Sequence, residues 1–360
     1  MKQSQAEEIT PSNLGQVTLV DVARVAGVAP MTVSRALHRP ELVKEATRAK
    51  VQEAVRVTGY VPNMLAGSLA SNRSHLVALL LPTIASSVFA DTVQALMDEL
   101  SLASYQTLIG LTGYSKEREE ALIESVLRRR PDAIVLVGAD HSRLTVERLQ
   151  RARVPVVEIW DLTTQPIDQV VGFSHERVGT TVAAHLMKLG YGRFGTIAVD
   201  DPRGQRRMNS FKAALARKGH HDCVSAELPA PATLASGREG LRRLIAAGPL
   251  PEVIFCSSDT VAAGAVQEAL SRGLRIPQEI AFMGFGDLSV ADQLHPRLST
   301  VRVDGQKIGH HTARTLIRRL QGVPPDEKHV EDLGFEIIER ETTRDARKSG
   351  FSKTGRPVRN

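Results

Sequence analysis

The sequence predicts a small all-α headpiece of the helix-turn-helix type, followed by an α/β core of two doubly wound parallel-sheet subdomains. Apolar residues follow a helical spacing in about the first 60 residues, whereas short aliphatic runs alternate with helical stretches from Leu76 onward. A length of 360 residues suits one small module and one larger one. The chain is therefore expected to have two folded parts.

Three short helices are expected in the headpiece. Thr18 and Asp21 have the spacing of a capping box, which predicts that a helix begins there. Gly27 breaks this helix, Pro30 is well placed to begin the second, and a third is expected over about residues 45–58. The apolar residues predicted to face inward are Leu19, Val22, Ala23, Ala26, Val33, Ala36, Leu37, Val51, Ala54 and Val55.

Composition and periodicity divide the chain into five segments. Residues 1–16 are polar without an apolar period, which predicts a disordered leader. The headpiece then occupies residues 17–61, and residues 62–75 are expected to form a short helix and linker. The α/β core is expected over residues 76–340, and residues 341–360 form a basic segment predicted to be disordered.

Short aliphatic runs are the evidence for the sheets of the core. Each is separated from the next by a stretch of helical length, which is typical of parallel strands with helices on both faces. The clearest runs cover residues 76–81, 133–138, 154–159, 194–199, 252–257 and 280–285.

Composition excludes some classes of protein and favours others. The start of the chain lacks an apolar signal segment and no run of about 18 apolar residues occurs, so we expect a cytoplasmic protein. A net charge of +6 suits a polyanionic partner, and residues 17–72 hold seven basic against four acidic residues.

The sequence predicts neither an enzyme nor a metal site. Cys223 and Cys256 match no disulfide or zinc pattern, so both are expected to be reduced thiols, with Cys256 in a buried strand. His310 and His311 adjoin on a helix and cannot face the same way. Dinucleotide, P-loop and hydrolase signatures are missing, so no cofactor is predicted. A sugar-metabolising enzyme and a sugar-binding transport protein are the alternatives.

The headpiece resembles that of the lactose-repressor (LacI/GalR) family almost position by position. The resemblance runs from VTLVDVARVAGV through TVSRAL to GYVPN, over three helices and a hinge. It implies a sequence-specific DNA-binding transcriptional regulator and favours a repressor. The sequence departs from the family at Ala29, where a serine or threonine commonly caps the recognition helix.

The resemblance assigns DNA contacts to the second helix. It places Pro30, Met31 and Arg35 at the base-reading positions in the major groove. Arg35 can form a bidentate contact with guanine worth about 1–3 kcal/mol of discrimination, the alternative being a solvated surface charge. The further expected DNA contacts are Thr18, Thr32 and Ser34.

A second set of DNA contacts is implied after the headpiece. Asn63, Ala66 and Leu69 resemble hinge-helix positions that enter the minor groove. In the family the leucine equivalent to Leu69 wedges between the central base pairs, although a helix-packing leucine is the alternative. Two hinge helices meeting at one DNA step imply a homodimer and a near-palindromic operator.

The core resemblance implies a ligand cleft. The family carries a core similar to periplasmic sugar-binding proteins, and this resemblance rests on residues 75–96, 206–215 and 256–287. Trp160 is added because it follows a strand, with a packing role as the alternative, and Asp259 has the alternative of capping the next helix. The residues expected to bind the effector are Ser86, Ser87, Phe89, Trp160, Arg207, Ser258, Asp259 and Asp287.

Within the family the sequence most resembles the gluconate-repressor branch, through LLPTIASSVFAD, SYQTLIG, PVVEIWD and VVGFSHE. This implies gluconate, a phosphorylated gluconate or a keto-gluconate as the effector. Arg207 can bind a carboxylate in fork geometry, and serine and aspartate side chains can pair with hydroxyls. Release of DNA on effector binding is favoured, and corepression stays open.

Overall fold

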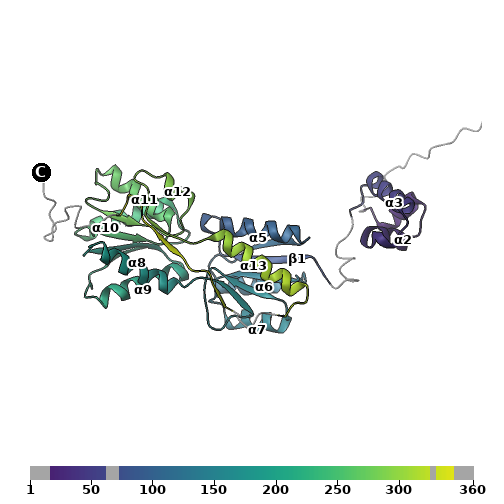
Figure 1. Ribbon diagram of the computed structural model, residues 1–360, viewed down its shortest axis with the longest axis horizontal. Helices are drawn as coiled ribbons and strands as arrows, with labels where there is room; N and C mark the ends of the chain where they lie inside the picture. Colours follow the sequence, from purple (N-terminus) through teal and green to yellow (C-terminus); the bar gives the residue numbers. More distant parts are fainter. Residues whose placement is uncertain (1–16, 62–72, 325–329, 344–360) are drawn as a thin grey trace, which may run out of the picture. The chain divides into compact units, whose positions relative to one another are not determined.

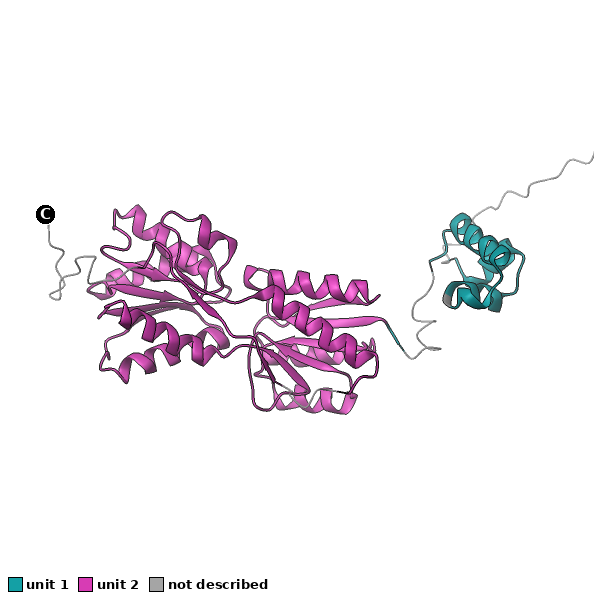
Figure 2. Cartoon of the chain, in the orientation of Figure 1, with its two compact units in different colours: residues 1–74 teal, residues 75–360 magenta. Residues whose placement is uncertain are grey.

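The computed structural model describes residues 17–61, 73–324 and 330–343. The chain divides into two compact units, residues 1–74 and residues 75–360 (Figure 2). Unit 1 holds the helices of the headpiece and unit 2 holds the parallel sheets. The predicted fold class is therefore confirmed in both parts.

Unit 1 is built from α1 (Leu19–Ala26), α2 (Pro30–His38), the 3-10 helix η1 (Pro40–Leu42) and α3 (Glu45–Thr58). All ten residues predicted to face inward belong to its apolar cluster or pack against it. Both halves of the predicted capping box of α1 are present, and Gly27 ends the helix with a left-handed φ of 67°. Glycine has no Cβ atom that would clash in that conformation, so Gly27 can form the turn that precedes α2.

Unit 2 contains two parallel sheets. The strand order β11-β5-β4-β3-β1-β2 gives a six-stranded sheet, and β7-β6-β8-β9 gives a four-stranded sheet. Each of the six aliphatic runs predicted as strands forms one: β1 (Leu76–Leu81), β3 (Ala133–Val137), β4 (Val156–Ile159), β6 (Phe194–Val199), β8 (Val253–Cys256) and β9 (Ala281–Met283). The remaining strands are β2 (Gln106–Leu111), β5 (Gln169–Gly172), β7 (Val224–Leu228), β10 (Thr300–Arg302), β11 (Val330–Asp332) and β12 (Glu336–Ile338).

Helices cover both faces of each sheet, as a doubly wound fold requires. On the six-stranded sheet α5 (Ala90–Leu102) packs beside α13 (Gly305–Leu320), and α6 (Lys116–Leu127) packs beside α7 (Arg143–Ala152) (Figure 1). On the four-stranded sheet the pairs are α8 (His175–Lys188) with α9 (Pro202–Ala216), and α10 (Leu234–Ala247) with α11 (Asp259–Ser271). The short elements η2 (Ser87–Phe89) and α12 (Ser289–Gln293) complete the fold.

The chain passes between the two subdomains of unit 2 at three places. These are the segment from β5 to α8, the segment from β10 to α13, and the segment from β11 to β12. Strands β10 and β12 pair antiparallel, so two of the connections are tied together. The carboxyl ends of the strands of both sheets therefore supply the residues between the subdomains.

None of the helices within the described ranges is long and apolar enough to cross a lipid bilayer.

Candidate functional site

The N-terminal turn of α2 presents an exposed surface on unit 1. Val33 and Ala36 are buried under the helix, whereas Met31 is 63% exposed and Arg35 is exposed. Pro30 is the first helical residue and is also exposed. Residues 31 and 35 stand one turn apart on the same face, which is the spacing that a base-reading helix needs.

The remaining predicted contacts of unit 1 differ in their surroundings. Thr32 and Ser34 are half-buried on α2. Thr18 is exposed, and its hydroxyl donates to Asp21 Oδ2 at 2.7 Å while its backbone N–H donates to the same oxygen at 3.0 Å. Thr18 therefore has a defined role in starting α1, and its contact with DNA stays a prediction. Asn63, Ala66 and Leu69 lie outside the described residues.

Ala29 precedes α2 in the N-cap position and makes no side-chain hydrogen bond to the helix. This agrees with the departure noted in the sequence. Pro30 lacks an N–H, so one of the unsatisfied donors of the first turn is removed rather than capped.

Unit 2 holds a cavity with about 460 Å³ of empty space between its two subdomains. We call it the first cavity. The six-stranded subdomain contributes Ser86, Val88, Phe89, Tyr114 and Trp160, and the four-stranded subdomain contributes His175, Val199, Asp201, Arg203, Arg207, Ala232, Ser257, Ser258 and Phe285. A ligand in the first cavity would therefore touch both subdomains at once.

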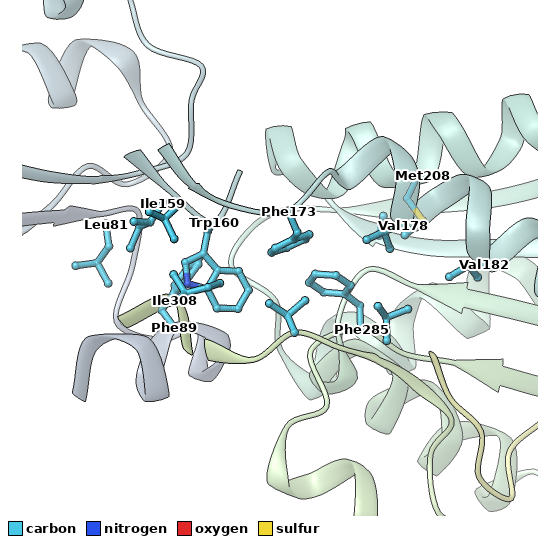
Figure 3. Close-up of a cluster of buried hydrophobic side chains, with 14 of the residues drawn as sticks. Leu81, Phe89, Ile159, Trp160, Phe173, Val178, Val182, Met208, Phe285 and Ile308 are labelled. Carbon is cyan, nitrogen blue, oxygen red and sulfur yellow. The ribbon is translucent and has the colours of Figure 1, made fainter. Parts of the chain in front are cut away.

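Aromatic rings from both subdomains line the first cavity. Phe89, Trp160 and Phe285 also belong to the buried apolar cluster drawn in Figure 3. Trp160 packs edge-to-face against Phe89 and Phe173, with ring centroids 5.3 and 5.8 Å away. The indole Nε1–H donates to Thr92 Oγ1 at 3.0 Å, and that hydroxyl donates to the carbonyl of Gly305 at 2.9 Å. Trp160 therefore both packs and lines the cavity, which joins the two roles considered for it.

Arg207 is held rigidly at the back of the first cavity. Its guanidinium lies 3.8 Å from the ring centroid of Phe285 and is 5% exposed as a residue. Nη2 donates to the carbonyl of Ser257 at 2.8 Å, and Nη1 lies 2.9 Å from His175 Nδ1. Burial lowers the pKa of Arg207 to about 10, so the side chain is still a cation near neutral pH.

The bond to Arg207 fixes the protonation of His175. Because a guanidinium can only donate, His175 Nδ1 must accept, and its Nε2–H then donates to the carbonyl of Trp160 at 3.0 Å. Burial and the neighbouring Arg207 hold the pKa of His175 well below its usual value. A neutral imidazole thus links the two subdomains and orients Arg207.

Arg203 lies one turn before Arg207 on α9 and also lines the first cavity. It is 9% exposed, and its guanidinium lies 5.2 Å from the ring centroid of Phe89. Among the residues that the structure describes, none forms an ion pair or hydrogen bond with this guanidinium. A helix start capped by Asp201, whose Oδ1 accepts from Gly204 N at 2.9 Å, places both arginines on this wall.

The structure brings together five of the eight residues expected to bind the effector: Ser86, Phe89, Trp160, Arg207 and Ser258. The other three, Ser87, Asp259 and Asp287, lie outside the cavity lining. Ser87 is exposed at the start of η2. Ser258, rather than Asp259, is the N-cap of α11, with its hydroxyl accepting from Val261 N at 3.3 Å.

Both displaced aspartates are engaged elsewhere. Asp259 is fully buried, accepting from Thr300 Oγ1 at 2.5 Å and from the backbone N–H of Leu288 at 2.7 Å. Asp287 pairs with Arg302 at 2.6 Å and with Arg340 at 2.7 Å. These contacts join segments of the core instead of facing a ligand.

Most of the polar lining was not predicted from the sequence. Tyr114, His175, Asp201, Arg203 and Ser257 each follow a strand, after β2, β5, β6, β6 and β8 respectively. Ligands collect at the carboxyl ends of strands in open parallel sheets. Applying that rule to every predicted strand, as was done for Trp160, would have found them.

A second cavity with about 520 Å³ of empty space adjoins the first, with Tyr114 and Arg203 in both linings. Its other charged residues are the cations Lys116 and Arg206 and the carboxylates Glu119, Asp140 and Asp161. Lys116 pairs with Asp140 at 2.7 Å, and Arg206 pairs with Asp161 across the two subdomains. The second cavity therefore holds charged side chains of both signs in balance.

Comparison with known proteins identifies the two units. Residues 18–63 match the family described as bacterial regulatory proteins, lacI family, and residues 183–343 match the periplasmic binding protein-like domain. A curated relative, the HTH-type transcriptional regulator GntR of Pseudomonas aeruginosa, is 36% identical over 331 residues, which are 91% of this chain and 96% of the relative. This match confirms the resemblance expected from the sequence, including its gluconate-repressor branch.

Solved structures agree. The crystal structure of a LacI family transcriptional regulator from Silicibacter pomeroyi superposes with a TM-score of 0.86 at 33% identity, covering 91% of this chain and 99% of that one. The lac repressor dimer bound to operator and the anti-inducer ONPF has a TM-score of 0.79 at 23% identity, covering 92% of this chain and 100% of that one. The second likeness concerns the fold alone.

Proposed function

This chain belongs to the LacI family of DNA-binding transcriptional regulators, and from that premise we propose that it is a repressor whose operator affinity is controlled by a sugar acid. The observation that carries the effector class is the pair of buried arginines, Arg203 and Arg207, on the wall of the first cavity. Buried cations in a ligand cavity favour an anionic ligand.

Operator recognition is assigned to α2. The exposed side chains of Met31 and Arg35 are available to base edges, with Arg35 donating to guanine in bidentate geometry and Met31 and Pro30 making apolar contacts. Thr18, Thr32 and Ser34 are proposed to contact the sugar-phosphate backbone.

The operator is proposed to be a near palindrome bound by a homodimer. A single α2 reads too few base pairs for useful specificity, whereas two copies related by a two-fold axis read two half-sites. Asn63, Ala66 and Leu69 of each copy are proposed to meet at the centre of the operator in the minor groove, where Leu69 separates two base pairs.

The effector is proposed to be gluconate or one of its phosphorylated or keto derivatives. Arg207 offers a fixed positive charge in the first cavity, which the hydroxyls of Ser86 and Ser258 and the rings of Phe89 and Trp160 also line. A relative named GntR adds support from the comparisons.

Control of DNA affinity is proposed to depend on closure of the two subdomains. Both line the first cavity, and Arg206 already pairs with Asp161 between them. An effector that touches both sides binds the closed state more tightly and shifts the population toward it. We favour release of DNA on effector binding, and corepression is the alternative outcome.

Fluorescence anisotropy on an operator selected from random DNA tests the proposal. The full-length chain should select a near-palindromic site, and gluconate, phosphogluconate or keto-gluconate should weaken binding. Glucose is the neutral control. Selection of no DNA sequence would refute the operator assignments above, whereas selection without a response to any sugar acid would refute only the effector class.

A further inference from the structure

Arg203 is a buried cation at the junction of two cavities, and it forms no ion pair within the part of the chain that the structure describes. It is 9% exposed and lines both the first and the second cavity. Its neighbours on α9 are engaged: Arg206 pairs with Asp161, and Arg207 bonds to His175 and Ser257. Among the described residues, Arg203 forms no hydrogen bond or ion pair; it lies against the face of Phe89, and Asp161 is near enough to interact with it electrostatically. Of the three arginines, it is the one that forms no hydrogen bond or ion pair with the described residues.

Burial of an unpaired charge is costly, so an anion that reaches Arg203 gains a charge-assisted hydrogen bond at little further desolvation cost. Asp201 is the nearest carboxylate on the same helix, and its Oδ1 is already used by the N–H of Gly204. Arg207 adds a second positive charge, with its Nε buried and unbonded among the described residues. Arg203 and Arg207 therefore give the first cavity two positive charges against the single carboxylate of Asp201, which suits one ligand carboxylate.

The second cavity differs from the first in chemistry. Lys116 and Arg206 are matched there by Asp140, Asp161 and Glu119, so the surroundings do not favour a second anion. Such side chains instead donate to and accept from hydroxyl groups, as sugar-binding sites require.

We propose that Arg203 is the residue that selects an acid, and that it fixes the direction of the ligand. The carboxylate lies in the first cavity between Arg203 and Arg207, and the hydroxylated chain passes Tyr114 into the second cavity. This inference rests on the proposed sugar-acid effector. It adds the residue that selects the acid, the orientation of the ligand between the two cavities, and the requirement that the ligand chain is long enough to reach the second cavity.

Calorimetry on the full-length chain with three probes tests the inference: gluconate, glucitol, which has the same chain without the acid, and glycerate, which has the acid on a three-carbon chain. Arg203→Gln should weaken gluconate binding about 10- to 100-fold, as expected for the loss of a charge-assisted bond, and leave glucitol binding unchanged. Arg203→Lys should keep part of the affinity. Arg217→Gln, at the far end of α9, is the control for losing one charge.

The second cavity is tested by Lys116→Ala, whose side chain is 49% exposed and can be removed without disturbing the core. The substitution should weaken the binding of gluconate and leave the binding of glycerate unchanged. Equal gluconate affinity of Arg203→Gln and the wild type would overturn the role of Arg203, and equal loss of both acids in Lys116→Ala would overturn the direction. Wild-type protein that binds gluconate and glucitol equally would also overturn acid selection. A wild type that binds none of the probes would refute the sugar-acid proposal itself.

Discussion

Asp259 offers a test of how a buried carboxyl group affects the stability of unit 2. Burial raises its pKa from 3.8 to about 6, in spite of the hydrogen bonds from Thr300 and Leu288. Between these values the folded state keeps a proton that the unfolded state has lost. Stability from this group is therefore present at low pH and declines as the pH rises through the window. The full loss is about 3 kcal/mol, at about 1.4 kcal/mol for each pKa unit.

Asp259→Asn removes this ionisation and also changes one hydrogen bond. The amide oxygen can accept from the N–H of Leu288 while the NH₂ group donates to the hydroxyl of Thr300, which can accept as well as donate. We expect the variant to be about as stable as the wild type near pH 4.5 and more stable than the wild type near pH 7.5. The difference should change by about 2 kcal/mol over this range.

Urea unfolding followed by tryptophan fluorescence measures the difference directly. Trp160 is the single tryptophan of the chain and is buried in unit 2, so its emission reports on this unit. Asp98→Asn, which removes an exposed carboxyl group on α5, is the control. A difference between Asp259→Asn and the wild type that does not vary with pH would refute the reasoning. Because Asp259 lies outside the cavity lining, gluconate affinity should be unchanged.

Three further changes have defined outcomes. Arg35→Ala should lower affinity for the selected operator by about 1–3 kcal/mol in anisotropy titrations and leave binding to random DNA nearly unchanged; an equal loss on both would mean that Arg35 contacts only phosphates. Ala29→Ser should supply the missing cap of α2 and stabilise the isolated headpiece by about 0.5–1 kcal/mol in thermal melts, and an unchanged melting temperature would count against the cap. Gly179→Ala places a Cβ 2.2 Å from the carbonyl oxygen of Arg207, so α8 and α9 must separate. Unit 2 should lose about 1–3 kcal/mol and gluconate affinity should fall, and a variant as stable as the wild type would contradict the close packing.

The fold was predictable because its signals are local. Gly27 and the pair Thr18 and Asp21 mark the ends of α1 through backbone conformation and capping, which depend on neighbours in sequence. The aliphatic runs of unit 2 are buried on both faces, so each is apolar throughout and is recognised without knowledge of its partners.

The site was harder to predict because its chemistry depends on distant partners. Asp259 and Asp287 have the residue type that a sugar site uses, but Thr300, Arg302 and Arg340 engage them from segments that only the fold brings near. Arg203 shows the converse. Nothing near Arg203 in the sequence shows that it is buried and forms no ion pair with the described residues. Its burial depends on Phe89, which belongs to the six-stranded subdomain.

The order of the strands in the six-stranded sheet has a consequence for synthesis on the ribosome. Its edge strand β11 and its covering helix α13 come after the whole four-stranded sheet in the chain. Ile308, Ala313 and Leu316 of α13 pack in the same buried apolar cluster as Leu79 of β1 and Leu96 of α5. That face stays uncovered until translation has passed residue 316, at about 5–20 residues per second. The subdomain that begins first is thus completed last, and the nascent chain carries a bare apolar surface while the other subdomain is made.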